Sequence, residues 1–450
     1  MSSCNFIHRE EEASPGRLVL PAYVVVTSGT ARVAFVGVTT PTTLVASKPS
    51  TFLSESGDYR AWDFIAGKGG KELFAAVQKA VDEAAAHADY VVVLGHLGVS
   101  PDCAPCMSTD VIAHTTNFVA FIDGHSHTSM EGVRVKNAVG KEVILAQTGC
   151  YLGALGCLTL EDGRCVAAST LFPARTKDPE VEWLETRLIG AVEQRLGTRI
   201  ATADASLCAF LPGTETRLAR SQDCAAGDFA ADACWWYAEA KAGLPCDFAL
   251  VNGGNVRADI PKGEVTLKTL RTVQPFGGDL AVVEVDGQTV LEALEFGAQT
   301  VGEGEFGGFL QVAGLRYTIN AKIPSGVRVS PAGAWTGGPL GECRVRDVKA
   351  YDRATGRYVP LDPKRRYRVV GQGFTLVEGG DGFEMFKRAV PVNKALETDY
   401  VVLGEYAKAF AKGRDGMPHL ASASSPLAAL PKYQIAYEAP AGSGRITIIR

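Results

Sequence analysis

Three histidines that follow short apolar runs in the first third of the chain could hold a metal ion. His96 comes after the run at 91–94, and His125 and His127 come after the run at 118–122; a glycine precedes both His96 and His125. Neutral imidazole is the commonest metal ligand in proteins, and ligands of α/β sheets collect at the carboxyl ends of strands. The pattern therefore indicates a metal site, against the alternative that each histidine is a hydrogen-bonded loop residue.

Three glycine-rich turns in the second half of the chain could bind an anion that carries a ring. They are Asn-Gly-Gly-Asn-Val-Arg at 252–257, Gln-Pro-Phe-Gly-Gly at 274–278 and Gly-Gly-Asp-Gly-Phe at 379–383. Glycine pairs let the backbone approach a ligand closely, and the planar fork of an arginine matches phosphate oxygens. The turns therefore combine an anion clamp with an aromatic stacking face.

Hydrophobic periodicity predicts the elements that position these residues. Apolar runs typical of strands alternate with helical stretches up to about residue 175, and strands with turn signals dominate from 248 onwards. The alternation predicts an α/β fold. The expected strands are 31–38, 91–94, 118–122 and 143–146, and the expected helices are 70–87, 178–197 and 224–241. The final run, 446–449, fits either an edge strand or a frayed tail.

Bulk composition excludes several classes of protein. A chain of 450 residues is expected to form two or three domains. Its 46% hydrophobic and 21% charged residues fit a globular protein, and the net charge of −5 argues against a nucleic-acid-binding surface. We find no apolar run long enough for a membrane span and no signal-peptide pattern at the N-terminus. The Cys-x-x-Cys at 103–106 lacks the second pair that a structural zinc site needs.

The ordered set of glycine-rich turns resembles the C-terminal substrate-binding domain of the 5′-nucleotidase family. Gly-His and Gly-His-x-His resemble the motifs of calcineurin-type metallophosphoesterases, and together the resemblance covers about residues 18–386. It implies the distal part of a layered metallophosphoesterase α/β domain at 1–177, a linker helix at 178–197 and an α/β substrate-binding domain at 198–450. The implied reaction is metal-dependent hydrolysis of a nucleoside 5′-monophosphate or a nucleotide anhydride, with domain closure during turnover.

The resemblance also assigns roles to single residues. His96 and His125 would hold one divalent metal ion and His127 would contact a second, in a two-metal centre of zinc, manganese or cobalt. The implied substrate-binding residues are Arg220, Asn252, Arg257, Phe276, Phe374 and Asp381. The arginines would clamp charge, and the two phenylalanines would hold the base. Thr375 is the alternative to Phe374, because the spacing to the Gly-Gly-Asp-Gly turn is one residue longer than usual.

Part of the family pattern is missing upstream. The family places Asp-x-His, Gly-Asp and Gly-Asn-His-Glu motifs before the strand that we match to 31–38, and only 30 residues precede that strand here. Asn5 and His8 are a weak echo of these motifs, and the catalytic histidine and bridging carboxylate stay unassigned. We expect either that the native protein has an upstream portion absent from this sequence, which we favour, or that this chain has lost half of its catalytic site.

Two other functions stay open at this stage. The chain could bind nucleotides without hydrolysing them, or it could be a 2′,3′-cyclic nucleotide phosphodiesterase, which the same architecture supports. In each case the expected partner is a small nucleotide, with no nucleic acid and no membrane span. The resemblance implies an extracellular or periplasmic location.

Overall fold

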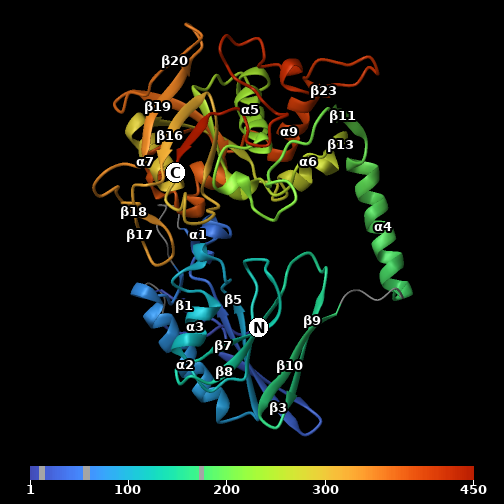
Figure 1. Cartoon of the computed structure of the whole chain (residues 1–450), viewed down its shortest axis with the longest axis vertical. Helices are drawn as coiled ribbons and strands as arrows, with labels where there is room; N and C mark the ends of the chain where they lie inside the picture. The colour runs from blue at the N-terminus through green and yellow to red at the C-terminus, as the bar shows by residue number, and fades with distance from the viewer. Residues whose placement is uncertain (10–15, 54–60, 172–176) are drawn as a thin grey trace. The chain divides into compact units, whose positions relative to one another are not determined.

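The computed structural model of the chain describes residues 1–9, 16–53, 61–171 and 177–450. It divides into two compact units (Figure 1). Unit 1 comprises Met1–Lys177 with Ser330–Gly333, and unit 2 comprises Asp178–Val329 with Ala334–Arg450. Both units mix helices and strands, so the α/β fold class is confirmed.

Unit 1 is built on a sheet in which the strand order is β2-β3-β5-β6-β8-β7. The four inner strands run parallel to one another, while β2 and β7 pair antiparallel at the two edges. The strands are β2 (Tyr23–Ser28), β3 (Ala31–Thr39), β5 (Tyr90–His96), β6 (Ala120–Ile122), β7 (Ser129–Lys136) and β8 (Glu142–Thr148). Smaller two-stranded sheets pair β1 (Phe6–His8) with β4 (Trp62–Phe64) and β9 (Leu155–Glu161) with β10 (Arg164–Leu171). All four strands expected in this unit are therefore confirmed.

Helices cover one face of this sheet. Helix α2 (Lys71–Ala85) buries Leu73, Val77, Ala80 and Ala84, whose spacing of three to four residues places them on one side of the helix. The helix predicted at 70–87 is therefore confirmed, and α3 (Ser108–His114) packs into the same core; the short α1 spans Thr43–Ala46.

The opposite face of the sheet is covered only in part by the described residues. The β9–β10 hairpin packs against a small cluster that includes Val92, Ala120 and Ile144. Leu94 and Ile122, near the ends of β5 and β6, remain 39% and 37% exposed. Parallel strands normally have both faces buried. Leu94 and Ile122 instead form an open apolar patch on the two strands that lead to His96 and His125.

Unit 2 contains three larger sheets. Their strand orders are β15-β12-β21-β14-β22, β20-β19-β16-β24 and β13-β11-β23, and a short hairpin pairs β17 with β18. The strands are β11 (Arg199–Ala203), β12 (Phe248–Asn252), β13 (Gly263–Thr266), β14 (Leu280–Asp286), β15 (Leu310–Ala313), β16 (Leu315–Asn320), β17 (Arg328–Val329), β18 (Trp335–Gly337), β19 (Val345–Asp352), β20 (Arg357–Pro360), β21 (Arg366–Gln372), β22 (Val390–Asn393), β23 (His419–Leu420) and β24 (Ile446–Ile449). Strand β24 pairs in parallel with β16 at the edge of its sheet, so the last run is an edge strand.

The helices of unit 2 pack on both sides of the five-stranded sheet. Helix α5 is buried along most of its length in a core shared with α9 and β12, and α7 packs in a second core on other side chains of the sheet. The helices are α4 (Pro179–Leu196), α5 (Ala225–Ala240), α6 (Leu267–Val273), α7 (Gly287–Gly297), α8 (Gly373–Leu376) and α9 (Asp399–Lys408). The helices predicted at 178–197 and 224–241 are confirmed as α4 and α5; α4 has no buried residue.

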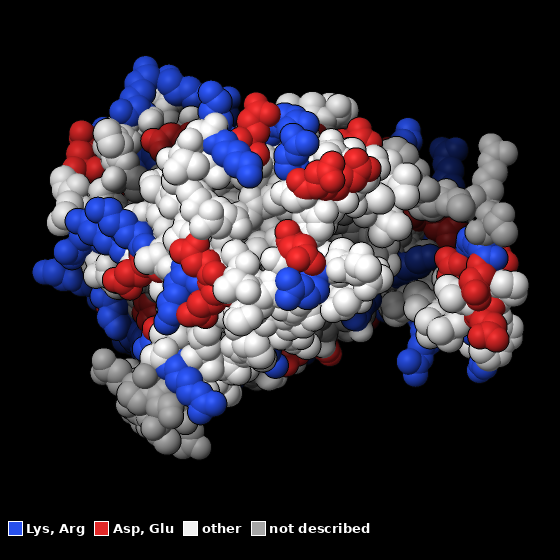
Figure 2. All heavy atoms as spheres, turned by 90° about the horizontal axis from the view of Figure 1, so that it is seen from below, with Lys and Arg blue, Asp and Glu red and all other residues white. Residues whose placement is uncertain are grey.

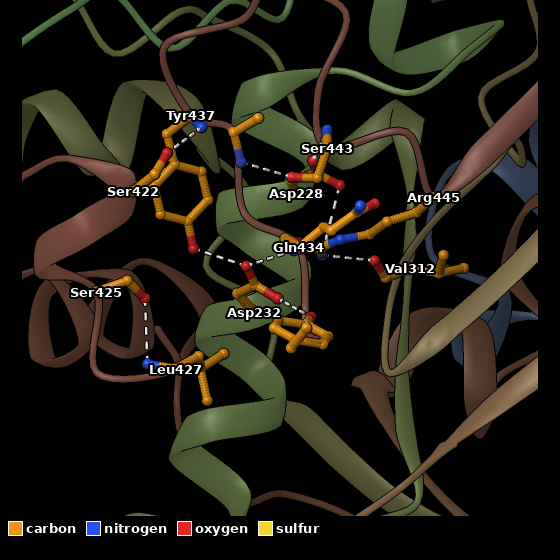
Figure 3. Close-up of polar contacts among 12 residues, drawn as sticks. Asp228, Asp232, Val312, Ser422, Ser425, Leu427, Gln434, Tyr437, Ser443 and Arg445 are labelled. Atoms are coloured by element: carbon orange, nitrogen blue, oxygen red, sulfur yellow. Dashed lines mark hydrogen bonds and ion pairs between the residues drawn. The ribbon is translucent and has the colours of Figure 1, made fainter. Parts of the chain in front are cut away.

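A buried charge network joins the C-terminal segment to helix α5 (Figure 3). The Arg445 guanidinium lies 2.7 Å from Asp232 Oδ2 and 3.4 Å from Asp228 Oδ1, and all three side chains are fully buried. Arg445 also donates to the carbonyl oxygen of Val312 in β15 at 2.8 Å, and Asp228 accepts from the Ser443 N–H at 2.6 Å. One cation therefore ties together the C-terminus, α5 and the five-stranded sheet.

Replacing this cation should be costly. We expect Arg445→Met to lower the free energy of unfolding by about 3–5 kcal/mol, because it leaves two buried carboxylates without their partner. Urea unfolding followed by tryptophan fluorescence measures the change. The matched control is Arg450→Met, five residues later, whose arginine contacts Gln222 at the surface; it should stay within about 0.5 kcal/mol of the parent chain. Equal values for the two variants would contradict the structural role of Arg445.

Candidate functional site

Four of the residues predicted to bind a substrate meet at one place in unit 2. Asn252 ends β12, and its Nδ2 donates to Asp381 Oδ2 at 2.8 Å across 129 positions of sequence. Arg220 and Arg257 both lie close enough to Asp381 for their positive charges to act on its carboxyl group. The structure therefore brings two cations, an amide and a carboxylate together from three separate turns.

The polar groups at this place are incompletely satisfied. Burial raises the pKa of Asp381, while the Asn252 hydrogen bond and the charges of Arg220 and Arg257 act in the opposite direction. Asn252 Oδ1 is buried and has no hydrogen-bond partner among the described residues. A buried acceptor without a donor costs free energy, so a ligand N–H group at this position would recover a lost hydrogen bond.

Close backbone approach, rather than side-chain packing, joins these turns. A Cβ atom added to Gly253 would lie 1.9 Å from the Ala219 carbonyl oxygen, so only glycine fits there. The Gly253 N–H donates to Phe309 O and the Gly254 N–H to Gly307 O, each at 2.7 Å. The first glycine-rich turn is therefore held against two other segments by its own backbone.

The two aromatic residues differ in exposure. Phe276, in the turn between α6 and β14, is 66% exposed, and the Arg257 guanidinium carbon lies 5.7 Å from its ring centre. Phe374, in α8, is partly buried and lies against Gly380, where an added Cβ would clash with its ring at 2.4 Å. Thr375, the alternative to Phe374, is fully buried. Of the two, Phe374 is the residue that a ligand could touch.

The segment 305–308 also borders the site, and our sequence analysis did not single it out. The Phe306 N–H donates to the Arg220 carbonyl oxygen at 3.0 Å, and an added Cβ on Gly307 would lie 3.6 Å from Asp381 Oδ2. Glu305 accepts from the backbone and side chain of Arg217. The Gly-Gly pair at 307–308 was the available signal, since it repeats the pattern of the other turns.

The acidic residues that follow Arg220 lie in the buried charge network around Arg445. Asp223 and Asp228 are both buried beside Arg445. Asp223 accepts from the Arg445 N–H at 2.8 Å, and burial raises its pKa well above the ordinary value. Both acids therefore belong to the buried charge network of Arg445.

In unit 1 the structure brings together two of the three predicted metal ligands. The ring centres of His96 and His125 are 5.0 Å apart. An added Cβ on Gly124 would lie 3.2 Å from His96 Nδ1, so this glycine leaves room for the ring. His127 packs instead against Tyr151, with ring centres 6.0 Å apart. Both His125 and His127 have positive φ angles, of 74° and 58°, which are uncommon for residues other than glycine.

The neighbouring carboxylate is occupied by the backbone. Asp123 accepts from the Leu97 and Gly98 N–H groups at 2.9 and 3.0 Å, and so ties the His96 loop to the His125 loop. Across the part of the chain that the structure describes, no group of three or more His, Cys, Asp or Glu residues is arranged to hold a metal. The two imidazoles fit part of a metal site and do not complete one.

Asn5 and His8, which weakly resemble the upstream motifs of the family, have structural roles in unit 1. The Asn5 amide donates to the Thr39 carbonyl oxygen at 2.7 Å and accepts from the Thr39 N–H at 3.0 Å. Thr39 is the register partner of His96 in the parallel pair β3–β5. Asn5 therefore positions the strand beside His96, and His8 belongs to strand β1.

Comparison with known proteins shows which proteins this chain resembles. Residues 199–388 match the family model described as 5′-nucleotidase, C-terminal domain. The snake venom 5′-nucleotidase of Naja atra is 26% identical over 429 residues, which are 88% of this chain and 72% of that protein. The structure is similar to the crystal structure of a 5′-nucleotidase precursor from Thermus thermophilus, with a TM-score of 0.69, 27% identity, and coverage of 93% of this chain and 78% of that one.

The resemblance to the 5′-nucleotidase family is therefore confirmed: the second unit carries a 5′-nucleotidase C-terminal domain, and 5′-nucleotidases are homologues of the chain. An apyrase of Tabanus yao is also similar, at 27% identity over 348 residues, 71% of this chain. The chain spans 58% of that apyrase and 65% of the venom 5′-nucleotidase of Crotalus adamanteus. Members of the family generally depend on divalent metal ions.

The close approach at Gly253 leads to a prediction. Gly253→Ala should lower the free energy of unfolding by about 1–3 kcal/mol, because the new methyl group must displace the Ala219 backbone. Differential scanning calorimetry of the whole chain measures the change. Gly278→Ala is the matched control, since no atom lies within 4 Å of the added Cβ. A Gly253→Ala chain as stable as Gly278→Ala would show that the two turns are not packed as described.

Proposed function

We propose that this chain binds a nucleoside 5′-phosphate in unit 2 and acts as a phosphoric ester hydrolase of the 5′-nucleotidase type. The observation that carries the proposal is the cluster of Arg220, Asn252, Arg257 and Asp381, with the exposed Phe276 beside it. Two cations suit a phosphate group, an unpaired buried amide oxygen suits a hydrogen-bond donor of the ligand, and an exposed ring suits a base. The names of the homologues agree with this assignment.

Within this proposal the residues have separate tasks. Arg220 and Arg257 clamp the negative charge, Asp381 accepts from ribose hydroxyl groups, and Phe276 and Phe374 stack on the base. His96, His125 and His127 are proposed as the contribution of unit 1 to a divalent metal centre. Because the described residues do not complete that centre, binding without hydrolysis is the alternative that the experiment below must distinguish. An extracellular or periplasmic location belongs to the same proposal, supported by the venom homologues.

The charged surface and the helices of the described residues bear on the proposed partner. Figure 2 shows one face on which Lys and Arg side chains lie interspersed with Asp and Glu. Among the residues that the structure describes, no helix is long and apolar enough to cross a membrane. A small nucleotide is the proposed partner.

Phosphate release from AMP tests the reaction. Any release by the 450-residue chain should require manganese, cobalt or zinc, should stop in EDTA, and should fall at least about a hundredfold in His125→Ala. The matched control is His87→Ala, an exposed histidine in the turn after α2. Calorimetric titration with AMP accompanies each assay. Binding without release would favour a nucleotide-binding protein, faster release from 2′,3′-cyclic AMP would favour the cyclic phosphodiesterase, and neither binding nor release would refute the proposal.

The base-stacking role of Phe276 makes a second prediction. Phe276→Ala should weaken adenosine binding by about 5- to 150-fold, since stacking on one aromatic ring contributes about 1–3 kcal/mol per base. Binding of ribose 5-phosphate, which has no base, should not change. Trp183→Ala removes another exposed aromatic of unit 2 and serves as the control. Equal losses for adenosine and ribose 5-phosphate would show that Phe276 acts on the fold of the turn and not on the base.

A further inference from the structure

Asp399 lies beneath two of the turns that form the proposed nucleotide site. It is the first residue of α9 and is 1% exposed. Its Oδ2 accepts from Asn255 Nδ2 at 3.1 Å, and its N–H donates to the Gly278 carbonyl oxygen at 3.0 Å. Asn255 follows Asn252 in the first glycine-rich turn, and Gly278 follows Phe276 in the second. One buried residue is therefore bonded to both turns.

The contact between Asn255 and Asp399 is shielded from water and specific in its direction. Asn255 is 5% exposed, so its amide has little access to solvent as an alternative partner. The other carboxylate oxygen, Oδ1, accepts from the Tyr400 N–H at 2.7 Å. Both oxygens of Asp399 thus act as acceptors toward N–H donors, and the ionised carboxylate is the form that satisfies both.

The two turns carry different parts of the proposed binding function. Arg257 belongs to the turn that Asn255 anchors, and Phe276 belongs to the turn that Gly278 anchors. The backbone N–H of Arg257 also donates to the carbonyl oxygen of Val273, the last residue of α6, at 2.8 Å. A loss of the Asn255–Asp399 bond would remove the side-chain link between the first turn and Asp399, which holds the second turn through Gly278.

We propose that Asn255 and Asp399 are positioning residues that fix the base-stacking turn against the anion-binding turn and thereby set the affinity of the site for nucleosides. Neither residue touches the ligand in this assignment. The proposal rests on the proposed function for its ligand, and on the two hydrogen bonds of Asp399 for its geometry. It explains why a buried acid stands at the start of α9, where no surface role is available to it.

The proposal implies a defined pH dependence. Burial raises the pKa of Asp399 to about 6, and this is opposed by its hydrogen bonds and by the positive charge of Arg271 from α6. The Cys234 thiol of α5 also interacts with it. A proton on Oδ2 would replace an acceptor by a donor that faces Asn255 Nδ2. Nucleoside affinity should therefore be constant well above pH 6 and should fall as the pH drops through about 6.

An exchange of the two side chains gives the sharpest test. Adenosine, which carries no phosphate, is titrated calorimetrically into the whole 450-residue chain at two pH values. One is about pH 7.5, above the pKa of Asp399, and the other lies below that pKa. We expect Asn255→Ala and Asp399→Asn to raise the Kd for adenosine about five- to tenfold, the effect of one lost hydrogen bond. The double variant Asn255→Asp/Asp399→Asn restores a donor opposite an acceptor, and should return the Kd to within about twofold. Asp399→Asn should also abolish the fall in affinity near pH 6.

Matched controls separate positioning from general stability. Asp286→Asn removes the charge of another acid at a helix N-terminus, the N-cap of α7, whose Oδ1 accepts from the Thr289 N–H at 2.7 Å. This variant should lower the Tm without changing the Kd for adenosine. Ribose 5-phosphate should bind all the variants equally, since it has no base to engage Phe276. A failure of the double variant to restore affinity, or an equal loss in Asp286→Asn, would overturn the proposal.

Amide hydrogen exchange of the unliganded chain makes the test independent of the ligand. Asn255→Ala should speed exchange in both turns, 253–257 and 276–279, while leaving the core strand β12 unchanged. If the parent chain binds neither AMP nor adenosine, the proposed function fails, and exchange still decides whether the two turns are coupled. If adenosine binds and exchange rises only in the turn that carries the substitution, the proposed function stands and the positioning role is refuted.

Discussion

The buried cation of Arg445 is the interaction on which the architecture of unit 2 depends. Its guanidinium group is matched by Asp228 and Asp232 from one helix and by the Val312 carbonyl oxygen from one strand. A fully buried charge is tolerated only when its partners are fixed, so these contacts define where α5 lies against the sheet. Strand β15, which contains Val312, pairs with β12, which ends in Asn252. The network thus connects the C-terminus of the chain to the first turn of the candidate site.

The site itself is assembled mainly by backbone contacts. Gly253 lies against the Ala219 carbonyl oxygen, and hydrogen bonds from Gly253 and Gly254 reach the 307–309 segment. Close approach of this kind leaves little space for side chains, which explains the glycine pair of the first turn, Gly253 and Gly254. The polar side chains then occupy the space between the turns, where Asn252 and Asp381 meet. Because these side chains are partly buried, each hydrogen bond between them is stronger than it would be at the surface.

In unit 1, only two of the three histidines predicted to bind metal at the strand ends converge. His96 and His125 converge because β5 and β6 are adjacent parallel strands that end at the same edge of the sheet. His127, two residues further, is turned toward Tyr151. The acid between the loops, Asp123, is engaged by two backbone N–H groups and so acts as a structural link. The open apolar face beside Leu94 and Ile122 lies on the same two strands.

Local sequence patterns determined the elements of this protein and indicated the class of ligand that we propose for it. Alternation of strand and helix patterns, the helical spacing in α2 and the ordered glycine-rich turns were readable because they depend on neighbours within a few residues. Only the tertiary structure decided which polar residues meet. Asp228 and Asp232 became partners of Arg445, more than 200 positions away, and Asn255 became the partner of Asp399, which no spacing indicates. The physical reason is that burial and long-range pairing, which decide whether a charged side chain binds a ligand or supports the fold, arise only when distant segments pack.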